Sequence, residues 1–211
     1  MNISRSARPS GSLMAMKINA RRAPLSWRLK NVLRWTYIKS WLAVFLIAPI
    51  ARFFGLMTAH ATLTARVHKA GGEWIDHGVL SRRLVTNNGV GFIVDAWQNT
   101  VELEIMKYHG CGTGATAENV ADSALQTEST TALNPDSTRA TGTLAESAAN
   151  AFQSVGTLTF DASAAVTEHG ILSQAATGGG VLFDRSVFSA INVASGDSIQ
   201  FTYTVTFTAG G

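Results

Sequence analysis

Apolar and polar residues alternate strictly over residues 198–208, near the C-terminal end of the chain. Successive side chains of a β-strand point to opposite faces, so this period of two predicts a strand with one buried face. The predicted buried residues are Ile199, Phe201, Tyr203, Val205 and Phe207. Shorter runs bounded by Gly, Asn and Asp predict further strands at 58–67, 74–85, 102–109, 152–160, 165–173 and 180–190.

One segment between these strands has a helical pattern instead. Residues 90–98 place Phe92, Ile93 and Trp97 on one side, which predicts a short helix. Short strands separated by turn residues, with one brief helix, are typical of an antiparallel β-sandwich of the jelly-roll or immunoglobulin-like type. We therefore expect a mainly β domain over residues 57–211.

Residues 1–56 have a different pattern and form a predicted basic, apolar helical arm. Ser26 is a plausible helix cap, and the residues that follow alternate between apolar and basic side chains. The ten residues Trp41–Ile50 then carry no charge. The residues expected to dock this arm on a partner are Trp27, Arg28, Arg34, Trp35, Trp41, Phe53 and Phe54.

Four interpretations of the arm stay open. A transmembrane helix needs about 20 apolar residues, and Pro49 and Arg52 interrupt that window. A secretory signal would be cleaved near Ala59–Ala61, but its basic region would be far too long. An amphipathic helix over 26–56 would lie on a protein partner or on a membrane surface, and we favour this interpretation. Finally, the natural product would begin at Met57. We expect the β domain to fold without the arm.

Charge divides the chain at Glu73, its first acidic residue. Residues 1–72 contain 12 Lys and Arg, whereas residues 73–211 contain 5 Lys and Arg against 14 Asp and Glu. Charged residues make up only 15% of the chain, so we expect much of the surface to be uncharged or covered by other subunits. This distribution is typical of a protein that docks on something and presents a β-rich body, and it is unusual for an enzyme.

Few residues suggest chemistry. The glycine-rich run at 110–116 lacks the GK[ST] of a phosphate loop, and we interpret its glycines as a sharp loop that needs positive φ. His109 and Cys111 are two residues apart, but no third ligand or orienting carboxylate stands nearby. As the only cysteine, Cys111 also excludes an intrachain disulfide. The sequence therefore predicts no catalytic, cofactor or metal site.

Two blocks of the sequence resemble small structural proteins of tailed bacteriophages. The first is the run Tyr108–Glu128, which contains Gly-Thr-Gly and later Asp-Ser-Ala-Leu. The second consists of the runs 167–174, 179–188 and 191–201. The resemblance covers about residues 60–208 and leaves the arm outside. Within the second block, Arg185 follows an apolar run and is expected to form a structural ion pair with Glu168.

The resemblance implies a non-enzymatic virion protein that decorates or cements the capsid lattice. Its partners would be the major capsid protein or tail proteins, together with further copies of itself. A tail-associated fibre or adaptor is the alternative. An alternative of another class is a membrane-anchored or exported bacterial β-domain, with membrane contact through residues 26–56. We expect no specific nucleic-acid partner, because the apolar excess of the arm favours protein or membrane contacts.

Overall fold

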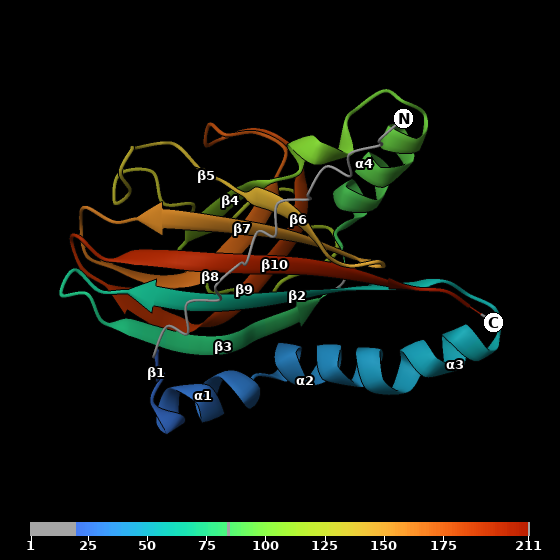
Figure 1. Cartoon of the computed structure of the whole chain (residues 1–211), viewed down its shortest axis with the longest axis horizontal. Coiled ribbons are helices and arrows are strands. Elements are labelled where there is room, and N and C mark those ends of the chain that lie inside the picture. Colours follow the sequence, from blue (N-terminus) through green and yellow to red (C-terminus); the bar gives the residue numbers. More distant parts are fainter. Residues whose placement is uncertain (1–19, 84, 211) are drawn as a thin grey trace, which may run out of the picture.

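The protein is mainly β and contains two mostly antiparallel sheets (Figure 1). The computed structural model describes residues 20–83 and 85–210. Six strands form the first sheet in the order β1 (Arg21–Arg22), β3 (Trp74–Arg83), β2 (Thr58–His68), β10 (Ser198–Thr208), β7 (Ala151–Thr159) and β6 (Thr143–Ala148). Four strands form the second in the order β5 (Ala140–Thr141), β4 (Tyr108–Gly112), β8 (Ala164–Leu172) and β9 (Leu182–Val193). Only β1 pairs in parallel among these named strands.

Helices lie in two parts of the described chain. Before the first long strand lie α1 (Leu25–Val32), α2 (Trp35–Leu42), the π-helix η1 (Ala43–Ile47) and α3 (Ala48–Phe53). Within the body lie α4 (Asn87–Trp97) and the 3₁₀ turn η2 (Leu103–Ile105). The first four follow one another in a row beside β3 (Figure 1). Residues 1–19 of the predicted arm lie outside the described residues.

The predicted body helix is confirmed, and it begins three residues earlier than expected. Thr86 caps it: its hydroxyl accepts a hydrogen bond from the backbone N–H of Gly89 at 3.0 Å. The strand predicted over 102–109 is wrong for most of its length, because Leu103–Ile105 forms a 3₁₀ turn and β4 begins only at Tyr108. Leu103 is exposed, so the apolar residues of this segment do not share one buried strand face.

The predicted faces of the C-terminal strand are confirmed for Ile199, Phe201, Tyr203 and Val205, which are all at most 3% exposed. Phe207 is only partly buried. This strand, β10, lies in the middle of the first sheet between β2 and β7, and its apolar face meets the second sheet. The Phe201 ring lies 4.4 Å from His169 of β8 and 6.2 Å from Phe188 of β9, measured between ring centroids. The two sheets therefore share one core.

Helix α1 closes one open side of this two-sheet body. The buried Asn31 side chain donates to the carbonyl of Leu80 in β3 and accepts from the backbone N–H of Ser189 in β9, both at 3.0 Å. Trp27 donates its indole N–H to the carbonyl of Ala190 at 2.8 Å. Strand β9 is an edge strand, and covering such an edge removes a site for unwanted strand pairing. These contacts cross the predicted domain boundary between residues 56 and 57, which stays a prediction.

Replacing Asn31 with alanine is expected to lower the free energy of unfolding by about 2–3 kcal/mol, because two buried backbone groups lose their partners. The measurement is urea denaturation followed by tryptophan fluorescence. Asn88→Ala, at an exposed position of α4, is the matched control and should change stability by less than about 0.5 kcal/mol. Equal effects of the two substitutions would show that α1 is not held on the body as described.

Candidate interaction surfaces and buried polar centre

The most elaborate polar site of the body surrounds the carboxylate of Glu168, which is fully buried on β8. Its Oε1 atom accepts hydrogen bonds from the backbone N–H groups of Gly114 at 3.1 Å and Thr127 at 2.7 Å. Its Oε2 atom accepts from the backbone N–H of Gln126 at 3.0 Å and from Nε of Arg185 at 2.8 Å. Four N–H donors thus stabilise one buried negative charge.

The structure brings the two residues of the predicted ion pair together and adds a third. Arg185, 4% exposed on β9, also contacts Asp122, with 3.0 Å between Nη1 and Oδ2. Sequence reasoning missed Asp122 and the three backbone donors, because all of them lie in the loop between β4 and β5. That loop carries no periodic pattern from which its path could be inferred.

The glycine-rich run serves this same centre, and the expectation of positive φ there is wrong. None of Gly110, Gly112 and Gly114 has positive φ. Gly112 pairs with Glu168 across the β4–β8 ladder. A Cβ atom on Gly114 would lie 2.5 Å from Oε1 of Glu168, and one on Gly112 would collide with the backbone of Thr127. These two glycines are therefore required for the close approach of three segments.

A second polar cluster lies inside the core, between the two sheets. His109 of β4 is hydrogen-bonded through Nδ1 to Nε2 of His169 at 3.0 Å and through Nε2 to the hydroxyl of Ser154 at 2.9 Å. Burial lowers the pKa of His109 to about 3 and lowers that of His169 well below its usual value. A hydroxyl in line with two imidazoles resembles a nucleophile relay, but all three side chains are at most 1% exposed. No substrate reaches them in this state.

Cys111 is buried without any exposed surface. Burial raises the pKa of its thiol to about 12, so the thiol is neutral near pH 7. A neutral, enclosed thiol is neither a nucleophile nor a metal ligand. No group of three or more His, Cys, Asp or Glu side chains within residues 20–83 and 85–210 has the geometry of a metal site.

The buried imidazoles predict a pH dependence of stability above the range in which carboxylates titrate. A histidine whose folded-state pKa lies below the unfolded value stabilises the fold fully above about pH 6.5, and that contribution is lost as pH falls toward the folded-state pKa. Between about pH 6.5 and 5.5, His109 and His169 should each remove about 1 kcal/mol from the free energy of unfolding. Urea melts across this range measure the slope. His109→Gln should reduce the slope of stability against pH by the contribution of one imidazole. An unchanged slope would contradict the conclusion that both buried histidines are neutral in the folded state.

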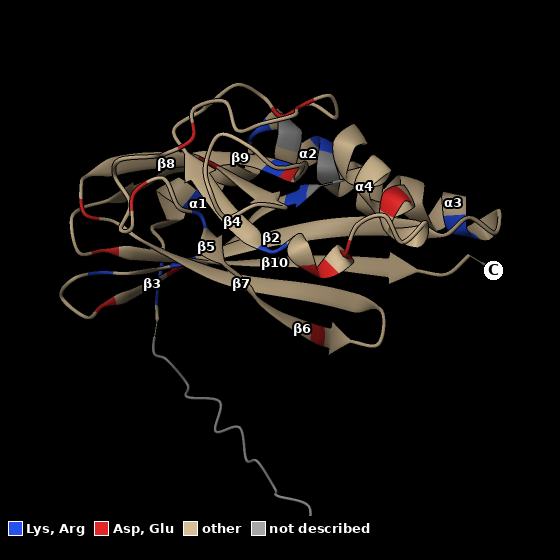
Figure 2. Ribbon diagram, turned by 90° about the horizontal axis from the view of Figure 1, so that it is seen from above, with Lys and Arg blue, Asp and Glu red and all other residues tan. Residues whose placement is uncertain are grey.

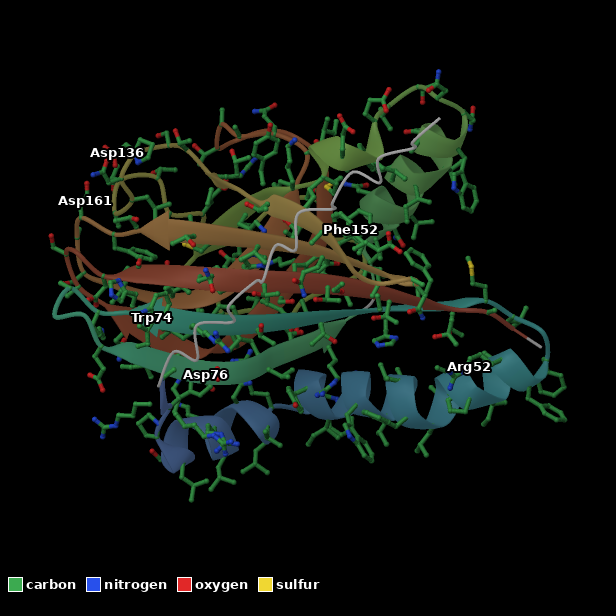
Figure 3. The ribbon with its side chains drawn as sticks, viewed as in Figure 1. Arg52, Trp74, Asp76, Asp136, Phe152 and Asp161 are labelled. Carbon is green, nitrogen blue, oxygen red and sulfur yellow. The ribbon has the colours of Figure 1, made fainter. Side chains whose placement is uncertain are left out.

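An apolar pocket of about 200 Å³ lies under α4, beside the C-terminal half of β10. Its lining is formed by Ile93, Trp97, Leu103, Met106, Phe152, Ile171, Phe183, Tyr203, Val205 and Phe207. An open groove next to it shares Phe152 of β7 (Figure 3) and adds the carboxylates of Glu102, Glu104 and Glu146. Trp97 lines the pocket and is still 74% exposed. This end of the body is therefore apolar with an acidic border.

The predicted docking residues of the arm do not share one surface, because some are exposed and others pack against the body. Trp27 is turned into the body, where its ring also lies edge-on to His77 at 4.5 Å between centroids. Arg34 is partly buried, whereas Arg28 is exposed. The four remaining aromatic residues are exposed: Trp35 and Trp41 on α2, Phe53 on α3, and Phe54 directly after α3.

Comparison with known protein families, known proteins and solved structures finds no match to this chain. Within the described residues, no single helix is long and apolar enough to cross a membrane. Two helical segments that meet at a bend of 67°, Leu25–Val32 and Tyr37–Phe53, have together the length and composition of one span.

Proposed function

We propose that this chain is a non-enzymatic structural protein of a tailed-bacteriophage particle. In this proposal the two-sheet body is a β-sandwich of the jelly-roll or immunoglobulin-like type that decorates or cements the capsid lattice. The helices before residue 57 form an arm outside the sandwich. The partners are the major capsid protein and further copies of the chain.

One observation carries the proposal. The two sequence blocks that resemble phage structural proteins pair along the β4–β8 ladder, and the most heavily bonded contact between them is the carboxylate of Glu168. That residue belongs to the second block, and it accepts hydrogen bonds from Gly114, Gln126 and Thr127 of the first block. The resembling residues are therefore used to hold the body together. A family pattern made of such residues supports an architectural role.

The remaining candidates for chemistry support the same role. His109, Cys111 and His169 have almost no exposed surface and make internal contacts. The exposed apolar residues of the body gather instead around α4, where Val90, Val94 and Trp97 are 43–74% exposed. An exposed apolar patch beside a pocket is a common contact surface for another protein. We assign the lattice contact of the body to the surface around the pocket, at the C-terminal end of α4 where Trp97 lies.

The test uses particles produced after the gene has been deleted from the genome that carries it. The chain or a variant of it is then supplied from a plasmid. Particles are purified on a density gradient, the chain is quantified against the major capsid protein by mass spectrometry, and its position is found by immunogold labelling. We expect a fixed ratio to the capsid protein and gold on the heads. Trp97→Ala with Leu103→Ala should reduce incorporation, whereas Val120→Ala should not. Val120 is a matched exposed residue near the opposite end of α4, where its carbonyl accepts from the N–H of Asn87.

Other outcomes assign the chain elsewhere. Gold on tails would make it a tail fibre or adaptor protein. Absence from particles, with the chain in the membrane fraction of the cells, would overturn the particle role in favour of a membrane-associated β-domain.

A further inference from the structure

The exposed apolar surface of this protein is concentrated in one short segment. Of the 19 large apolar residues that are exposed in the described part of the chain, 14 lie between Leu25 and Met57. They include Ile47 at 63%, Ile50 at 60% and Phe53 at 79% exposure. The helices α1, α2, η1 and α3, which we call the helix row, carry ten of these 14, and Leu33, Phe54, Leu56 and Met57 lie next to them. A patch of this extent on a folded protein marks a surface that something covers.

The helix row is held to the body along one side only. Asn31 and Trp27 fix α1 to β3 and β9. Farther along, Nη1 of Arg82 in β3 lies 2.9 Å from the hydroxyl of Tyr37 in α2, and its guanidinium lies 5.9 Å from the centre of the Phe45 ring. Phe45 is 49% exposed although it touches the body here, and residues such as Phe53, at 79% exposure, are open to solvent.

Charge on the helix row has one sign. Arg28, Lys30, Lys39 and Arg52 lie on its helices, and no acidic residue occurs before Glu73 (Figure 2). Figure 3 places Arg52 on α3, at the far end of the row from α1. The body carries all 14 acidic residues of the chain. A surface that is both basic and apolar complements a partner with negative charge at its surface and an apolar interior below it.

We infer that the helix row is a docking surface for an anionic lipid bilayer. The helices lie parallel to the membrane plane, with leucine, isoleucine and phenylalanine side chains in the outer acyl region. Trp35 and Trp41 lie at the level of the headgroups, as tryptophan does at membrane interfaces. Lysine and arginine extend to the lipid phosphates. The β body remains on the aqueous side.

A bilayer fits these observations better than a protein groove. A groove on a protein partner offers acidic side chains at particular points, whereas the basic residues are spread from α1 to α3. The bend of 67° between the helical segments also prevents the row from entering one straight groove. This inference does not rest on the particle role, because it concerns a surface made by residues 25–57 and the particle contact is assigned to the α4 end.

The test is flotation of the purified full chain with vesicles of phosphatidylcholine, with or without about a third phosphatidylglycerol. We expect binding to the anionic vesicles, at least about tenfold weaker binding to the neutral ones, and strong weakening in about 1 M salt. Arg28→Gln with Lys30→Gln should weaken binding about fivefold for each charge removed.

A matched pair of variants separates the apolar contact from net charge. Ile47→Glu with Ile50→Glu changes two exposed residues of the helix row and should reduce binding to anionic vesicles by more than about tenfold. Val90→Glu with Val120→Glu makes the same change in charge at two exposed residues of the body and should leave binding within about twofold. Because all four positions are exposed, circular dichroism should show an unchanged fold.

Several results would overturn the inference. Failure to bind anionic vesicles would overturn it. Equal binding to anionic and neutral vesicles that is unchanged by salt would overturn it too. An equal loss in both glutamate variants would show that only net charge matters. If Ile47→Glu with Ile50→Glu instead dissociates an oligomer of a chain that binds no vesicle, the helix row is an interface between copies. None of these results bears on the presence of the chain in particles.

Discussion

Replacing Glu168 with glutamine is expected to lower the free energy of unfolding by about 3–5 kcal/mol, enough to unfold a marginal domain. Each carboxylate oxygen accepts two N–H donors, so the amide NH₂ of glutamine would face two donors in either orientation. Arg185 would also keep its buried positive charge with only the partly exposed Asp122 as partner. Urea denaturation of the purified chain measures the loss.

Two controls separate this effect from the loss of any carboxylate. Glu146→Gln removes an exposed carboxylate of β6 and should cost less than about 0.5 kcal/mol. Glu168→Leu with Arg185→Leu removes both charges but leaves the backbone N–H groups of Gly114, Gln126 and Thr127 without an acceptor. A smaller loss than that of Glu168→Gln would show that the unpaired buried charge of Arg185 is the larger cost. If the double replacement lowers the free energy of unfolding more than Glu168→Gln does, the pairing of the two charges is not the main contribution of this site to stability.

Phe201→Ala is the second large effect, with an expected loss of about 3–5 kcal/mol. The Phe201 ring has no exposed surface and lies between His169 and Phe188 of the opposite sheet. Truncation to alanine leaves a cavity in the core between the two sheets. The same urea melts give the magnitude, and near-ultraviolet circular dichroism should show looser aromatic packing.

The matched control lies three residues away, on the other face of the same strand. Thr204 is partly exposed, and its hydroxyl accepts a hydrogen bond of 3.2 Å from Gln153 of β7. Thr204→Ala should cost less than roughly 0.5 kcal/mol. A larger effect of this change on particle binding than on folding would make the polar face a docking surface. A larger effect on folding than that of Phe201→Ala would mean that the buried face of β10 is assigned wrongly.

The properties that follow from short-range periodicity were predictable from the sequence. Strict alternation assigned the buried face of β10, because a strand has only two faces and the apolar residues occupy one. The helix of the body followed from its apolar spacing, and the capping Thr86 explains the earlier start. The 3₁₀ turn at Leu103–Ile105 could not be foreseen, because a short apolar run without strict alternation fits a turn and a strand equally well.

Long-range pairing was not predictable. Nothing local indicates that β10 lies between β2 and β7, or that the loop after β4 returns to place Gln126 and Thr127 against Glu168. Trp27 shows the same limit on the arm, because its apolar ring fits a partner and its own body equally well. The carbonyl of Ala190 and the ring of His77, both far away in the sequence, hold it on its own body.

The strand order also sets the relation between synthesis and folding. The first long strand of the chain, β2, pairs along its whole length with the last, β10, and β10 alone joins β2 to β7. A ribosome that has made everything except the final strand has therefore produced two separate halves of the larger sheet, each with an unpaired edge. Such edges invite aggregation, and closing so long a loop is slow. The nascent chain can complete this sheet only after residues 198–208 have left the ribosome, whereas all strands of the second sheet are made before that point.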